Sequence, residues 1–217
     1  MAPHSSGGLA TWRTSGGEMK HETSLALYAY WEGCRRTTGI RPQGIQAAEL
    51  APLLPSLFLL DLPISGNFRF HFCGATLAMR YGRDLCEEPF LPLWNAEDRT
   101  TLEPNLRYLA TRSAGLVAGV MAETVGGGFT SFEMLLLPLA GDKGAAGAIG
   151  SMVRVGGHEE TNRIRARIVG QWLRSIRFLP EAEAVKPTRC TPVYRVPPTR
   201  ASAARRYRHL TVVSGGK

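Results

Sequence analysis

The residues of this sequence that could bind a ligand or react are charged and aromatic residues that lie within or next to apolar runs. Glu133 lies in a run with Phe132 and Leu135 in which it shares a strand face with leucines. A carboxylate that faces inward needs a charged or hydrogen-bonding partner. His71, Arg69 and Arg154, on neighbouring predicted strands, are candidate partners. Such a pair either fixes a ligand at the sheet or forms a structural ion pair, and the residue types alone favour the structural role for Glu133 and His71.

Two further side chains belong to the loop region of the chain. Arg83 follows Gly82 at the end of a predicted short helix, and Trp94 lies in a segment with two prolines. Arg83 either orients the turn or lines the mouth of a cavity; Trp94 either packs the loop onto the core or closes a pocket as an aromatic lid. The structural role is favoured for each. The candidate ligand-binding residues are therefore His71, Arg83, Trp94 and Glu133.

The motifs of common catalytic and nucleotide-binding sites are missing from the sequence. It contains no G-x-S-x-G, H-E-x-x-H or Walker A pattern, and no G-x-G-x-x-G that follows a strand. Its 5 histidines and 4 cysteines are scattered without the spacing of metal ligands. We therefore expect neither an enzyme nor a metal site. Scattered cysteines are typical of reduced thiols in the cytoplasm.

The net charge of +8 on 217 residues is concentrated at one end of the chain. Residues 1–179 carry 18 Lys and Arg against 16 Asp and Glu, whereas residues 180–217 carry 8 against 2. Residues 180–217 also contain five prolines and few large apolar side chains, which predicts a flexible basic tail. Its densest cluster is Arg205, Arg206 and Arg208. This cluster could bind nucleic acid, an anionic membrane surface or an acidic protein, or it could be solvated charge only.

Composition divides the chain into three parts. Residues 1–20 are rich in Gly and Ser and predict a disordered extension, so that Met19 is an alternative start. Residues 21–179 form the predicted domain, and residues 180–217 form the tail. No uncharged apolar run of eighteen residues and no signal-peptide core is present, which predicts neither a membrane span nor secretion.

Hydrophobic periodicity predicts an α+β domain. Helices are expected at 22–36, 46–53, 75–81 and 96–112, strands at 57–60, 68–72, 116–125, 129–139 and 146–155, and a closing amphipathic helix at 161–178. Asn95 and Asp98 form a weak helix-start signal, and Pro104 predicts a kink or break near Glu103. The result is a five-stranded antiparallel sheet with a helical crossover, flanked by N- and C-terminal amphipathic helices.

Large aromatic residues lie on the apolar stripes of the two flanking helices. Trp31 belongs to the first helix and Trp172 to the predicted last one. They either cover the outer face of their own sheet or meet a second copy of the chain, because aromatic residues are enriched at interfaces. We expect a homodimer that uses both.

Short stretches along the body share their order and spacing with a known family. They are Tyr30-Trp31, Leu53-Leu54-Pro55, Phe58 to Asp61, Phe70 to Gly74, Tyr81 to Leu85, Leu93-Trp94 with Asp98-Arg99, and Phe132 to Leu139. With these the chain resembles a bacterial family of stand-alone PAS-like domains. The family usually has Arg where His71 stands and Thr where Ala75 stands, so the resemblance does not carry over to this chain a ligand contact at those two positions.

The resemblance implies a sensory or regulatory module of signal transduction that binds small ligands or other proteins. Haem is disfavoured because residues 75–113 contain no His for an axial ligand. Flavin is disfavoured because Cys86 follows Gly82-Arg83 one residue later than in flavin photosensors, so the cofactor stays unknown. We expect a cytoplasmic regulatory module without an output domain, acting through a small ligand, a partner protein or both. The alternative is a nucleic-acid- or anion-binding protein that uses the basic tail.

Overall fold

The computed structural model describes residues 19–37, 45–63, 65–111, 114–141, 144–156 and 166–179. The strands are β1 (Leu57–Asp61), β2 (Phe70–Cys73), β3 (Leu116–Thr124), β4 (Phe129–Gly141), β5 (Gly144–Arg154) and β6 (Ile168–Phe178). The helices are α1 (Glu22–Thr37), α2 (Ala47–Leu50), η2 (Leu54–Ser56), α3 (Ala75–Tyr81), η3 (Leu91–Leu93) and α4 (Ala96–Thr111). The basic cluster of Arg205, Arg206 and Arg208 lies outside the described residues, as do nearly all of the predicted extension and the whole predicted tail.

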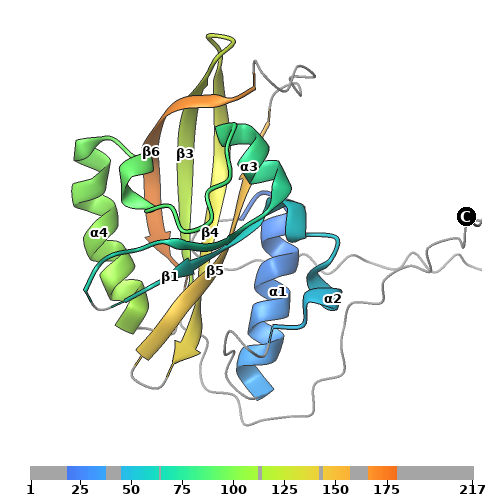
Figure 1. The fold of residues 1–217 in the computed structure, drawn as a ribbon. Coiled ribbons are helices and arrows are strands. Elements are labelled where there is room, and N and C mark those ends of the chain that lie inside the picture. Colours follow the sequence, from blue (N-terminus) through green and yellow to red (C-terminus); the bar gives the residue numbers. More distant parts are fainter. Residues whose placement is uncertain are drawn as a thin grey trace, which may run out of the picture.

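The strands form one antiparallel sheet in the order β2-β1-β5-β4-β3-β6 (Figure 1). β1 and β2 pair as the predicted hairpin, with Phe58 opposite Cys73. The chain then passes through α3 and α4 before it returns to the sheet at β3. The predicted α+β class and helical crossover are therefore confirmed.

The closing element is a strand, so the helix predicted over 161–178 is wrong where the structure describes it. β6 pairs with β3 and places Met121 opposite Trp172 and Val117 opposite Arg177. The error has a physical reason. Apolar residues repeat every fourth position from Ile164 to Ile176, and residues four apart share a face in an α-helix and also in a strand of period two. The sheet consequently has six strands among the described residues instead of five.

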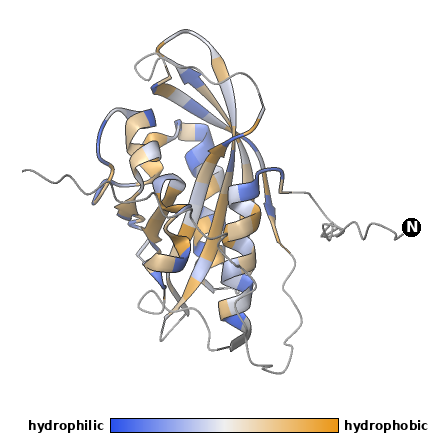
Figure 2. Ribbon diagram, turned by 90° about the vertical axis from the view of Figure 1, so that its right-hand side faces the viewer, coloured by the Kyte–Doolittle hydropathy of each residue, from blue (hydrophilic) through white to orange (hydrophobic). Residues whose placement is uncertain are grey.

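Each face of the sheet buries its own set of side chains. Along β4, Phe132 and Met134 belong to a cluster that includes Leu77 of α3 and Leu106 of α4, which we call the crossover-side core. Leu135 and its neighbours on the opposite face pack with α1 and form the α1-side core. In Figure 2 hydrophobic residues run along the strands and alternate with hydrophilic ones along the helices. Because successive side chains of a strand point to opposite faces of the sheet, β4 contributes side chains to both cores.

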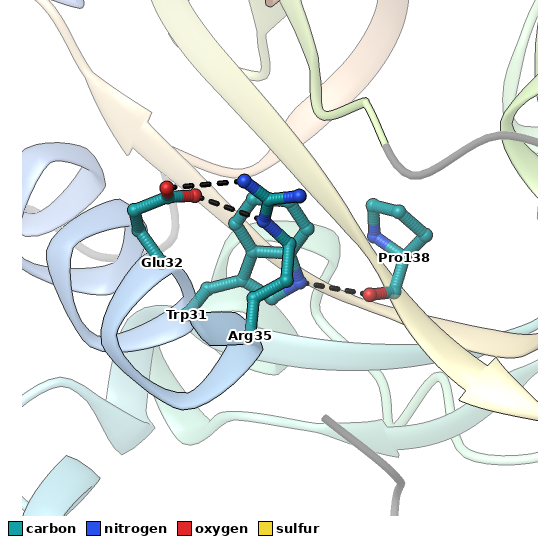
Figure 3. A network of polar contacts seen from close by, with 4 residues as sticks. All are labelled: Trp31, Glu32, Arg35 and Pro138. Atoms are coloured by element: carbon teal, nitrogen blue, oxygen red, sulfur yellow. Dashed lines mark hydrogen bonds and ion pairs between the residues drawn. The ribbon is translucent and has the colours of Figure 1, made fainter. Parts of the chain in front are cut away.

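α1 is fixed to β4 by a buried indole. Trp31 is 3% exposed, and its Nε1 donates to the carbonyl oxygen of Pro138 at 2.8 Å (Figure 3). The Arg35 guanidinium lies 5.3 Å from the Trp31 ring centroid and also pairs with Glu32 at 3.0 Å. Trp31 therefore covers its own sheet, which is the first of the two roles expected for it.

Local signals place the crossover helices. Gly82 ends α3 in the left-handed conformation at φ 68°, and Asn95 Oδ1 accepts the Asp98 backbone N–H at 2.8 Å at the start of α4. Of the kink or break predicted near Glu103, the break is not formed, since α4 continues through Pro104. A proline removes one helical hydrogen bond, whereas Leu102 and Leu106 bury both halves of α4 against the sheet.

Candidate functional site

Two of the four candidate ligand-binding residues lie at the surface. The side chain of His71 is 65% exposed, and its Nδ1 lies 3.9 Å from Asp61 Oδ1. The side chain of Arg83 is 56% exposed, and its Nη2 lies 3.9 Å from Glu88 Oε2. Pairs as exposed as these contribute little to stability. Neither side chain is enclosed by the core.

Glu133 is buried on the α1 side of the sheet and holds the start of the domain. It is 5% exposed and accepts the backbone N–H of Lys20 at 2.7 Å and that of His21 at 3.3 Å. His71 lies three strands away on β2, about 14 Å at the usual strand spacing. The two side chains therefore do not form the pair considered from the sequence. Glu133 anchors the segment that leads into α1.

Trp94 lies inside the crossover-side core. It is 2% exposed and ends a chain of aromatic contacts in which the centroids of Phe58 and Phe70, Phe70 and Phe90, and Phe90 and Trp94 lie 5.6, 5.6 and 5.8 Å apart. Trp94 thus packs its loop onto the core. Its indole Nε1 is buried and has no hydrogen-bond partner among the described residues.

A polar group that the sequence did not single out lies on the same side of the sheet. Tyr81 Oη donates to Gln171 Oε1 at 2.5 Å and lies 3.8 Å from Met152 Sδ. Burial raises the pKa of Tyr81, so its hydroxyl stays protonated. Gln171 is 3% exposed, and its Nε2 has no partner in the part of the chain that the structure describes.

The segment that carries Trp94 docks onto β6 close to Gln171. Asp98 Oδ2 accepts the Leu173 backbone N–H at 2.9 Å and the Asn95 side-chain amide at 2.7 Å. Asn95 directly follows Trp94, and Leu173 lies two positions from Gln171. The carboxylate of Asp98 therefore joins the two segments that bear unpartnered donors.

The chemistry available in the crossover-side core is hydrogen-bond donation within an aromatic surrounding. Gln171 Nε2 and Trp94 Nε1 are both donors, and a buried donor without a partner costs about 1–3 kcal/mol. An acceptor oxygen brought in by a ligand would remove that cost. No three His, Cys, Asp or Glu side chains among the described residues gather closely enough to hold a metal ion. Within the same residues no helix is both long and apolar enough to cross a bilayer.

Sequence reasoning missed Gln171 for one reason. A helix over 161–178 places Gln171 beside the apolar stripe instead of on it, whereas in β6 its side chain is buried beneath α3. The sequence signal that could have found it is the run Ile168-Val169, whose β-branched residues favour a strand.

A match to a protein family agrees with this architecture. Residues 19–153, more than half of the chain, match the PAS domain family. Among solved structures the chain is similar to the "Crystal Structure of Rhodobacter Sphaeroides LOV protein", with 11% identity, a TM-score of 0.38, and coverage of 61% of this chain and 68% of that chain. No curated protein gave a significant match. The resemblance stated from the sequence is confirmed: the chain belongs to the PAS domain family and is a sensory or regulatory module.

Proposed function

We propose that this PAS domain acts by binding a small ligand between its sheet and the segment from α3 to α4. The ligand has an apolar body and carries oxygen atoms that accept hydrogen bonds. The observation that supports this most is the pair of buried donors, Gln171 Nε2 and Trp94 Nε1, which have no partner among the described residues. The aromatic side chains of Phe70 and Phe90 supply the apolar surrounding.

We propose binding without catalysis. The two donors are a neutral amide and a neutral indole, and neither is a nucleophile or a general base. The three described cysteines are free thiols, which supports a cytoplasmic module.

Native mass spectrometry of freshly purified full-length protein tests ligand binding. We expect a bound small molecule on the wild-type chain and its loss from Gln171→Leu and Trp94→Phe, since each variant removes one donor and keeps a side chain of similar size. His71→Ala is the matched control: because His71 is exposed, this variant should retain the small molecule as the wild-type chain does. Equal retention in all four proteins would contradict the proposed donors.

A second candidate function is self-association through the exposed aromatic pair of Phe129 and Trp172. Phe129 is 66% exposed and Trp172 is 37% exposed, with their ring centroids 6.2 Å apart. β6 is also an edge strand of the sheet. Exposed aromatic residues at one place on a surface are typical of an interface, and a second copy would bury this pair symmetrically.

Sedimentation equilibrium tests this candidate. A homodimer should dissociate when Trp172 or Phe129 is replaced by Ser. Replacing Tyr108 by Ser is the control: Tyr108 is also exposed and packs on Phe178 of β6, and the homodimer should stay intact. A wild-type chain that stays monomeric throughout the accessible concentration range excludes it.

The alternative of nucleic-acid or anion binding is supported by the charge of residues 180–217 alone. Removing residues 185–217 should then abolish retention on DNA, RNA and anionic vesicles. The affinity of the full chain should also fall steeply with salt.

A further inference from the structure

Two cysteines on either side of α3 lie on neighbouring segments of the chain. Cys73 is the last residue of β2, and Cys86 lies in the loop that follows α3. That loop runs antiparallel to β2: the Glu87 backbone N–H donates to the Phe70 carbonyl oxygen at 2.7 Å. The Phe70 N–H in turn donates to the carbonyl oxygen of Glu88 at 3.0 Å. This pairing brings the loop back alongside Cys73.

A tight turn holds Cys86 in this position. The Glu88 backbone N–H donates to the Leu85 carbonyl oxygen at 2.9 Å, which encloses Cys86 and Glu87 in the turn. Glu87 adopts φ 62°, a left-handed conformation that non-glycine residues rarely adopt. Leu85 is fully buried and anchors the turn on the core. The surrounding contacts therefore fix the place of Cys86 although its side chain is exposed.

The two sulfur atoms influence each other. The backbone N–H of Cys73 stabilises a thiolate on Cys86, and the backbone N–H of Leu85 stabilises one on Cys73. The charge of a Cys86 thiolate also raises the pKa of Cys73, after the larger effect of burial. These effects agree with the backbone pairing that places the loop after α3 beside β2. Desolvation and the Asp84 carboxylate raise the pKa of Cys86 as well, so only a small fraction of either thiol is ionised at neutral pH, and that thiolate fraction is the species that reacts.

We propose that Cys73 and Cys86 are a redox pair that closes to an intrachain disulfide when the protein meets hydrogen peroxide. The exposed Cys86 reacts first as its thiolate: a bond forms from its sulfur to one peroxide oxygen, the O–O bond breaks, and the leaving hydroxide takes up a proton to become water. Cys73 then attacks the sulfenic sulfur of Cys86 as a thiolate. The S–S bond forms, the S–O bond breaks, and a second water leaves with the proton of Cys73.

Closure would tie the two ends of α3 together. The disulfide joins the residue just before Gly74, where α3 begins, to the loop that follows Gly82, where it ends. This gives the module a redox input at a place separate from Gln171 and Trp94. It does not require the proposed ligand.

Peptide mapping of the full-length protein tests the redox pair. The protein is treated with hydrogen peroxide, free thiols are blocked with iodoacetamide, and digestion follows without reductant. We expect a cross-linked peptide pair containing Cys73 and Cys86, with the mass of two hydrogen atoms lost and its complete release by dithiothreitol. Cys34→Ser is the matched control and should keep the cross-link, because Cys34 lies in α1.

Cys86→Ser should abolish the cross-link and leave Cys73 free to alkylate after unfolding. Because Cys86 is exposed, this variant tests the pair even where Cys73→Ser fails to fold. Three results would overturn the proposal: both cysteines recovered as thiols after peroxide treatment, Cys86 recovered as sulfinic acid with Cys73 still reduced, or Cys86 linked to a second chain.

Discussion

The hydrogen bond between Tyr81 and Gln171 can be separated from the unpartnered amide beside it by a double-mutant cycle. Tyr81→Phe removes the donor to Gln171 Oε1 and leaves the whole Gln171 amide buried without a partner. We expect it to lower the free energy of unfolding by about 1–3 kcal/mol. Gln171→Leu removes the unpartnered Nε2, yet it leaves the Tyr81 hydroxyl with Met152 Sδ at 3.8 Å alone. These two effects oppose each other, so its net change should stay within about 1 kcal/mol.

The double variant Tyr81→Phe with Gln171→Leu removes all of these polar groups together. It loses one hydrogen bond with a net contribution of about 1 kcal/mol and relieves a buried donor that costs about 1–3 kcal/mol. We therefore expect a chain between unchanged and about 2 kcal/mol more stable than wild type, although Tyr81→Phe alone destabilises it. This non-additivity is the signature of the half-satisfied amide.

Equilibrium unfolding in urea, followed by tryptophan fluorescence, measures the cycle. Additive changes in the two single variants, or a double variant less stable than Tyr81→Phe, would refute the reasoning. The same double variant separates stability from binding: it should fold at least as well as wild type and still lose the proposed ligand. A double variant that retains a ligand found on the wild-type chain would show that Gln171 does not bind it.

Three further predictions concern the anchor, the tight approach beside α3 and the buried thiol. Glu133→Gln should lower stability by about 1–3 kcal/mol and speed amide exchange at residues 20 and 21, because a neutral amide accepts their N–H groups more weakly; unchanged exchange would contradict the anchor. Gly74→Ala should be far more destabilising in urea unfolding than Gly127→Ala, since a Cβ at position 74 would meet a backbone oxygen of Leu54. Gly127, at φ 77°, has open space around it, so Gly127→Ala should cost only about 1–2 kcal/mol for its left-handed conformation. Burial raises the pKa of Cys73 to about 11 from 9.0, so iodoacetamide should modify it at pH 8 roughly 100-fold more slowly than after unfolding, with a tenfold gain per pH unit up to about pH 11; equal rates in the folded and unfolded chain would refute the shift.

The sequence could predict those parts of the fold that neighbouring residues encode. Gly82 and the pair Asn95 and Asp98 act within a few positions of themselves, and both end up where local helix signals place them. β6 could not be predicted in the same way, because a spacing of four fits a helix and a strand equally well. The β-branched pair Ile168-Val169 favours a strand only weakly, and the pairing with β3 that decides the matter is a contact with a distant part of the chain.

Side-chain partners were harder to predict than elements. The partners of Glu133 are backbone N–H groups more than 110 positions away, at Lys20 and His21. A backbone donor has no residue type, so a search for cations such as His71 could not find it. Trp94 was placed correctly against the core because its size alone favours burial.

The two faces of the sheet satisfy their buried polar groups differently, and this difference indicates where function lies. On the α1 side, Glu133 accepts two N–H groups and Trp31 Nε1 has a carbonyl acceptor, so both groups stabilise the fold. On the crossover side, Gln171 Nε2 and Trp94 Nε1 lack partners among the described residues. Buried donors that cost stability persist where something other than stability selects them. Because Glu133 and Trp31 find partners on one face of the sheet while Gln171 and Trp94 each keep an unpartnered donor among the described residues on the other, the crossover-side core is where binding is to be sought.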